Sequence, residues 1–244
     1  MRELVESGIS PAEAARTVLL SAAPVANDAA PTTADGLDIA RHRLLAATQR
    51  YDAAAIDVEL TRLSMLVDAQ TLYERVISPL VVEVGQRWED GIVSVAQEHL
   101  LSERLEVSLR AALRTLERPD GPLVLLASVA SESHVLGLLG AALRFAGAGA
   151  RVVLLGAITP PSAIADAVRS MAPRLVGLSI STTPKNAASL FRAYGDACGE
   201  TTWVVGGPAA SSVEAAVTEA GGILAPGPSS SWQAHLRDWL RGVR

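Results

Sequence analysis

The sequence predicts an α/β protein in which an N-terminal four-helix bundle precedes a parallel five-stranded sheet. Two observations predict this class. Leucine and valine recur at helical spacings over residues 37–118, and from Leu123 onward short apolar runs alternate with helical stretches. The chain has 244 residues, of which 49% are hydrophobic and 19% are charged. It is therefore long enough for two domains with cores of their own.

The first 36 residues are expected to lie outside both domains. Residues 1–20 show a short helical pattern that is interrupted at Gly8 and resumes with Ser10 as a helix N-cap and Pro11 at the first helical position. Residues 21–36 are rich in Ala, Pro, Thr and Asp without a period. This composition predicts a linker.

Residues 37–118 are predicted to form the bundle, because their apolar positions are spaced by three, four or seven residues or by sums of these. Its last helix has a clear start signal, since Ser94 and Gln97 form a capping box. This start places Glu98 and His99 in the first turns of the helix. The periodic positions are Leu44, Leu60, Leu63, Leu72, Val76, Leu80, Val84, Leu105, Leu109, Leu113 and Leu116.

Residues 121–244 are predicted to form the sheet, which we expect to be flavodoxin-like or Rossmann-like. Each apolar run is followed by a helical stretch, and such strand–helix units build a parallel sheet covered on both faces. If the strand order is 2-1-3-4-5, the ligand crevice lies between the first and third strands, where the order reverses. The predicted strands are 123–129, 151–155, 175–179, 201–205 and 223–225.

Three loops at this crevice carry candidate ligand-binding residues. His134 follows the first strand, and an imidazole there can bind a metal, although a loop histidine with satisfied hydrogen bonds is the competing interpretation. Ser179 and Ser181 end the third strand, where hydroxyls also serve as helix caps. Gly206 and Gly207 follow the fourth strand and either let a ligand approach the backbone or form a plain turn. Together these loops suit a large ligand with a metal centre and a long polar tail.

Composition excludes several classes of function. The net charge is −5, aromatic residues make up 4% of the chain, and basic residues form no dense run, so we expect no nucleic acid binding by this chain alone. Cys198 is the single cysteine, which excludes an internal disulfide or a multi-thiolate zinc site and predicts a small core residue in a reducing cytoplasm. Apolar stretches are interrupted by charges, so we expect neither secretion nor a membrane span. The sequence shows neither a nucleophile–base pair nor a paired carboxylate site, so we do not expect an enzyme.

The sheet loops resemble the cobalamin-binding flavodoxin-like domain. The resemblance rests on the run 132–137, on Leu155-Gly156 with Thr159-Pro160, and on the serine and glycine loops. It implies that His134 is the lower cobalt ligand in place of the cofactor's own dimethylbenzimidazole, and that Glu132, where the family has Asp, orients the imidazole. The nucleotide tail would insert beside the serine and glycine loops. The implied cofactor-binding residues of this domain are Glu132, His134, Gly137, Gly156, Ser179, Ser181, Gly206 and Gly207.

The bundle resembles the light-sensing cobalamin modules of CarH-type regulators, because Trp88 is followed by nine residues and then by Glu98-His99. The resemblance implies that the bundle caps the upper face of the corrin. Trp88 would pack against the upper axial ligand, and Glu98 and His99 would enclose an adenosyl group, which makes adenosylcobalamin the expected cofactor. Taken alone, Trp88 would be interpreted as a buried bundle aromatic.

Two departures from this family stand out. Residues 1–20 resemble only the closing helices of a MerR-type DNA-binding domain, so the chain is either a truncated product of a longer regulator or signals through a partner. Glu89 occupies the position where the family has a histidine that binds cobalt after photolysis, and His99 is a substitute candidate. Both departures fit the photocobilins, which resemble these modules but bind biliverdin as well as cobalamin.

The sequence therefore favours a cobalamin-binding light sensor. In this hypothesis, photolysis of the upper cobalt–carbon bond changes domain pose or oligomerisation and so signals to a partner. We expect a homo-oligomer, either a dimer or a tetramer. The alternatives are a photocobilin-type receptor with biliverdin, a corrinoid methyl-carrier subunit of a methyltransferase, and an interaction module that has lost its cofactor.

Overall fold

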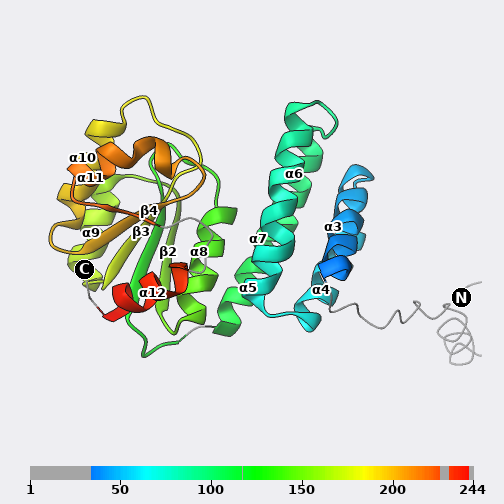
Figure 1. Cartoon of the computed structure of the whole chain (residues 1–244), viewed down its shortest axis with the longest axis horizontal. Coiled ribbons are helices and arrows are strands. Elements are labelled where there is room, and N and C mark those ends of the chain that lie inside the picture. Colours follow the sequence, from blue (N-terminus) through cyan, green and yellow to red (C-terminus); the bar gives the residue numbers. More distant parts are fainter. Residues whose placement is uncertain (1–33, 117, 226–230, 242–244) are drawn as a thin grey trace, which may run out of the picture. The chain divides into compact units, whose positions relative to one another are not determined.

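Figure 1 shows the computed structural model of the chain, which describes residues 34–116, 118–225 and 231–241. The expected helical segment over residues 1–20 and most of the expected linker over residues 21–36 lie outside the described residues. Helix α3 (Ala34–Gln49) begins before the predicted bundle boundary at residue 37. The Ala- and Asp-rich composition that predicted a linker there is also compatible with the first turn of a helix.

The helical part after α3 consists of two long helices and one segmented helix. A short α-helical turn, a π-helical stretch and a longer α-helix follow one another without a break and form the segmented helix. Together with α3, they make four helical segments among the described residues that precede the sheet, as predicted. Their bounds are α4 (Ala53–Leu66), α5 (Ala69–Thr71), η1 (Leu72–Ile77), α6 (Ser78–Glu89) and α7 (Val95–Leu116).

The helix starts follow local capping chemistry. The Asp52 carboxylate accepts a hydrogen bond from the Ala55 backbone N–H at 3.0 Å and so caps α4. The predicted capping box is confirmed, because the Gln97 amide oxygen accepts from the Ser94 backbone N–H at 2.8 Å and the Ser94 hydroxyl accepts from the Gln97 backbone N–H at 3.2 Å. Of the predicted periodic positions, all except Leu116 are buried.

The sheet has the predicted order, β2-β1-β3-β4-β5, and every strand pair is parallel. The second strand runs beyond its predicted end at residue 155, because Gly156 and Ile158 adopt positive φ angles of 91° and 50° and the register with β1 shifts there. The strands are β1 (Leu123–Val129), β2 (Arg151–Thr159), β3 (Leu175–Ser179), β4 (Thr202–Gly206) and β5 (Ile223–Leu224).

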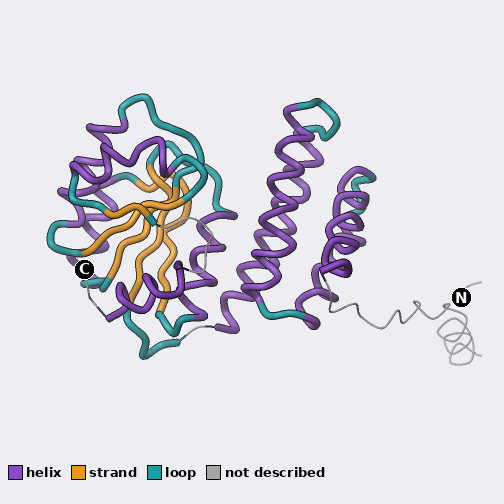
Figure 2. Tube along the Cα trace, in the orientation of Figure 1, coloured by secondary structure: helices purple, strands orange, loops and turns teal. Residues whose placement is uncertain are grey.

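Helices cover both faces of the sheet (Figures 1 and 2). One face packs a core that contains Phe191, Tyr194 and Cys198. Burial raises the pKa of the Cys198 thiol to about 12. Cys198 is thus the small core residue that the sequence predicted. On the other face, Phe145 packs against Trp239 with ring centroids 6.4 Å apart. The first face carries α9 (Pro161–Met171), α10 (Ala187–Cys198) and α11 (Glu214–Glu219), and the second carries α8 (Leu136–Gly147) and α12 (Ser231–Arg241).

Strand periodicity explains how the two faces differ. Along β1, Leu125 and Ala127 point into the core under α9 to α11, whereas Leu126 points to the opposite face and lines a cavity there. That cavity lies on the α8 side, at the carboxyl ends of the strands. Within the described ranges, no helix is both long and apolar enough to cross a membrane.

Candidate functional site

The loop between β1 and α8 presents the His134 imidazole on a rigid support. The Glu132 side chain is almost fully buried and accepts hydrogen bonds from the His134 backbone N–H at 2.8 Å and from the Ser181 backbone N–H at 2.6 Å. Its Oε1 also lies 2.5 Å from His134 Nδ1. The Ser128 hydroxyl donates to the His134 carbonyl at 3.0 Å. The His134 side chain itself is 68% exposed, so the loop is fixed while the imidazole stays accessible.

The electrostatics of Glu132 favour one arrangement of this pair. Burial opposes ionisation of Glu132, but the backbone N–H groups of His134 and Ser181 and the His134 ring together hold its pKa below the ordinary value. A charged carboxylate next to Nδ1 keeps the proton on that nitrogen. In the neutral imidazole, the lone pair then lies on Nε2, which is the atom that a metal ion would bind.

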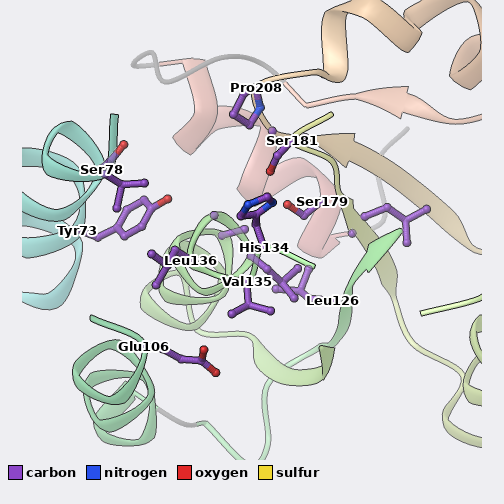
Figure 3. Close-up of a pocket in the computed structure, with 18 of the residues that line it drawn as sticks. Tyr73, Ser78, Glu106, Leu126, His134, Val135, Leu136, Ser179, Ser181 and Pro208 are labelled. Carbon is purple, nitrogen blue, oxygen red and sulfur yellow. The ribbon is translucent and has the colours of Figure 1, made fainter. Parts of the chain in front are cut away.

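A cavity of about 800 Å³ opens above this imidazole. Its sheet side includes His134, Ser179 and Ser181, and its helical side includes Tyr73 and Ser78 (Figure 3). The structure thus brings together most residues that the sequence singled out. Those that line the cavity are Glu98, His99, His134, Gly137, Ser179, Ser181, Gly206 and Gly207.

Three expected residues are not among those that line the cavity. Glu132 is buried and acts through its hydrogen bonds to His134 and Ser181. Trp88 is 48% exposed and lies in the last turn of α6, beyond the residues with which that helix lines the cavity. Gly156 lies at the irregularity of β2, where its carbonyl accepts a hydrogen bond from the Thr159 hydroxyl at 3.2 Å. Its positive φ therefore serves the strand geometry. A contact of Trp88 or Gly156 with a bound ligand stays a prediction.

The glycines of the site have different reasons to be there. Gly207 has a φ of 118°, and a Cβ atom there would overlap the Ile180 carbonyl, so the turn itself requires glycine. Gly137 has only the Ser179 hydroxyl near its Cβ position, at 3.8 Å. Its lack of a side chain is not needed for packing and leaves room in the cavity next to His134.

The helical wall carries a hydrogen-bonded polar group. The Ser102 hydroxyl donates to Glu98 Oε1 at 2.6 Å, and Glu98 Oε2 pairs with His99 Nδ1. These residues follow one another along the side of α7 that faces the cavity. His99 is 73% exposed, so its ring is held mainly by Glu98.

Sequence reasoning missed several cavity residues with polar groups, among them Tyr73, Ser78, Ser102, Glu106 and Arg144. None belongs to a recognisable spacing. The available signal was Gly140, because a glycine inside an apolar helix costs stability and so indicates a close packing partner. That partner is Tyr73, whose ring lies where a Cβ atom of residue 140 would be.

Comparison with known proteins agrees with this geometry. Residues 40–113 match one family model described as a B12 binding domain, and residues 122–229 match a second one with the same description. The chain therefore has two B12-binding domains, which together span most of it. The resemblance of the module to CarH-type proteins is confirmed, and cobalamin is the cofactor class of these domains.

The curated relatives are regulators from Myxococcus xanthus. The chain is 33% identical to the HTH-type transcriptional repressor CarH over 184 residues, which cover 73% of this chain and 62% of CarH. It is 35% identical to the HTH-type transcriptional repressor CarA over 158 residues, which cover 61% of this chain and 52% of CarA. The chain thus spans less than two thirds of either relative.

A solved structure supports the fold. The monomethylamine corrinoid protein of Methanosarcina barkeri matches with a TM-score of 0.65 at 15% identity, over 82% of this chain and 98% of that protein. At this identity the match establishes the architecture alone.

The residues of the cavity fit a cobalamin. Among the described residues, no group of three or more His, Cys, Asp or Glu side chains could hold a bare metal ion. A corrin brings its own four equatorial nitrogens, so one imidazole is sufficient on the protein side. Glu132 next to Nδ1 favours the tautomer in which the lone pair of the neutral His134 ring lies on Nε2, as this role requires.

Proposed function

We propose that this chain is a cobalamin-dependent light sensor that binds adenosylcobalamin in the cavity, with His134 as the lower cobalt ligand. The observation that carries the proposal is the Glu132–His134 pair, which points an accessible imidazole into a cavity whose opposite wall is polar. When bound, adenosylcobalamin supplies a cobalt–carbon bond that light can break. The residues of the chain bind and orient the cofactor and respond to the change in its upper ligand.

On the sheet side, the chain holds a proton and a carboxylate in place. Glu132 keeps the proton on His134 Nδ1, and its second oxygen is held by the Ser181 backbone N–H. The imidazole therefore cannot rotate freely. Because it is already ordered, little conformational entropy is lost when its Nε2 binds a ligand in the cavity.

On the helical side, Glu98, His99 and Ser102 offer hydrogen-bonding groups to the upper ligand. The adenosyl group carries ribose hydroxyls and adenine nitrogens, which match carboxylate, imidazole and hydroxyl partners. Ser102 orients the Glu98 carboxylate toward His99. Loss of the adenosyl group would remove contacts made only in the dark state.

A change of this kind can act as a signal only if the ligand contacts the two states of the protein differently. The α7 residues Glu98 and His99 would contact the upper ligand, and His134 before α8 would bind cobalt. Both groups of contacts would therefore affect the position of the helical domain relative to the sheet domain. We propose that their loss alters domain pose or the assembly of a homo-oligomer, and that a cytoplasmic partner reads the change.

Two other functions compete with this proposal. A photocobilin-type receptor would bind biliverdin in addition to cobalamin. A corrinoid methyl carrier, whose fold class the chain shares, would need an upper face that is open to a partner enzyme. Glu98 and His99 on the opposite wall favour the sensor over the carrier.

Absorption spectra test the proposal. The protein is loaded with adenosylcobalamin in darkness, with and without biliverdin, and spectra and particle size are recorded before and after green or red light. The sensor is supported by an irreversible change of the cobalamin spectrum with a change in oligomer size, and a strong red band would identify the biliverdin variant. Bound cobalamin with no response of the protein to light would favour the methyl carrier, and absence of cobalamin binding would overturn both.

A further inference from the structure

The π-helical segment η1 is joined to α8 by a close side-chain contact. Tyr73 lies in η1, and its ring and hydroxyl occupy the space where a Cβ atom of Gly140 would be. Gly140 is buried in the interior of α8. The contact is possible only because residue 140 has no side chain. π-helical turns are rare and often occur at functional sites.

The next residue of η1 strengthens this connection. The Glu74 carboxylate accepts a hydrogen bond from Arg144 Nε at 2.9 Å, one turn further along α8. Gln70 also donates to the same carboxylate oxygen, at 3.1 Å. Two successive residues of η1 thus contact two successive turns of α8. The position of η1 relative to α8 is fixed by two features together. One is the packing of the Tyr73 ring on Gly140, called the seat below, and the other is the Glu74–Arg144 ion pair.

The seat lies next to the ligand cavity. Tyr73 lines the cavity on its helical side, and His134 lies on the opposite side (Figure 3). His134 precedes the first residue of α8 by two positions. Gly140 therefore connects, through one helix, the loop that holds the imidazole and the ring that forms the opposing wall. Movement of the ring off Gly140 would change the height of the cavity above His134.

We infer that Tyr73, seated on Gly140, is a positioning residue that determines which upper ligands the site accepts. The inference rests on the proposed function. A cobalamin with a bulky adenosyl group reaches the helical wall, so its affinity depends on where that wall stands. A cobalamin with a small upper ligand, such as hydroxocobalamin, does not reach it. The seat accordingly controls discrimination between the two, while His134 supplies affinity that they share.

The test is Gly140→Ala, with Gly147→Ala as the matched control on the same helix. A methyl group at residue 140 forces the Tyr73 ring back by about 1.5 Å to reach normal contact distance. Gly147 has nothing within 4 Å of its Cβ position, so its substitution changes helix propensity alone. The cofactor-free 244-residue chain is titrated in darkness with adenosylcobalamin and, separately, with hydroxocobalamin.

We expect Gly140→Ala to lower the preference for adenosylcobalamin over hydroxocobalamin by about tenfold, and Gly147→Ala to leave the ratio of the two Kd values unchanged. Tyr73→Phe should keep the ratio, because the ring remains. In a Tyr73→Ala background, Gly140→Ala should have no further effect, since the overlapping ring is gone. Amide exchange without cofactor should rise in residues 72–77 in Gly140→Ala only.

The outcomes separate the inference from the proposed function. Equal loss of affinity for both cobalamins in Gly140→Ala, or an unchanged ratio, would overturn the positioning role while leaving the sensor intact. A further loss from Gly140→Ala in the Tyr73→Ala background would also overturn it, because the effect would then be one of helix α8 itself. If the unsubstituted chain bound neither cobalamin, both proposals would fail.

Discussion

The two walls of the cavity are built in different ways. On the sheet side, His134 is held by a carboxylate that is 1% exposed and that also accepts two backbone N–H groups. On the helical side, Glu98 and His99 are held by each other and by Ser102, and the His99 side chain is 73% exposed. The sheet wall is therefore preorganised before any ligand arrives, whereas the Glu98–His99 part of the helical wall can adapt. Such a division suits a site in which cobalt stays bound below and the upper ligand changes.

The largest effect is expected from His134→Ala. It removes the atom that would bind cobalt, so cobalamin affinity should fall by more than about hundredfold. The exposed ring contributes little to the core, and Glu132 keeps its two backbone N–H partners, so the variant should stay folded. Equilibrium titration and a melting curve measure the two quantities. Undiminished affinity would show that the sheet wall does not hold the metal.

Glu132→Gln should have the next largest effect. The amide keeps the size of the side chain but loses the charge that holds the proton on Nδ1, which should weaken cobalamin binding by about 10–100-fold. The exposed Glu103 on α7 offers a control in Glu103→Gln, which should leave affinity unchanged. An effect as small as that of the control would mean that the sheet wall is no better organised than the helical one.

His99→Ala tests the adaptable wall. Since its ring is largely exposed and has one partner, we expect only about a two- to fivefold loss in affinity for adenosylcobalamin and no loss for hydroxocobalamin. Binding of both cofactors in darkness gives the comparison. An equal loss for both would place His99 near the corrin itself and not near the upper ligand.

Trp88→Ala should have the smallest effect, less than about twofold on either cobalamin, because the side chain is 48% exposed and lies off the cavity wall. The same titrations measure it. A loss as large as that of Glu132→Gln would show that the helical wall moves onto the ligand and carries Trp88 with it, as the resemblance to CarH-type modules implies.

Local patterns made much of the fold predictable from sequence. A parallel sheet followed from the alternation of apolar runs and helices, and the strand order on which the crevice depended is the one observed. The start of α7 followed from Ser94 and Gln97 alone. The contact between Glu132 and His134 could also be predicted from the sequence, since the two residues are two positions apart on one loop. In each case the interacting groups are close in sequence, or the strand pattern repeats.

Contacts between distant segments were decided only by the tertiary structure. No pattern in the sequence predicts the hydrogen bond from the Ser181 backbone N–H to Glu132 or the packing of Tyr73 on Gly140. The same holds for the position of Trp88 off the cavity wall. They depend on how the helices and the sheet pack, and packing is set by the shapes of many side chains at once. The sequence by itself predicted the fold class and, through its resemblance to cobalamin-binding domains, the imidazole that would bind cobalt. The tertiary structure decided which side chains face that imidazole across the cavity, because that depends on side-chain shapes from separate parts of the chain.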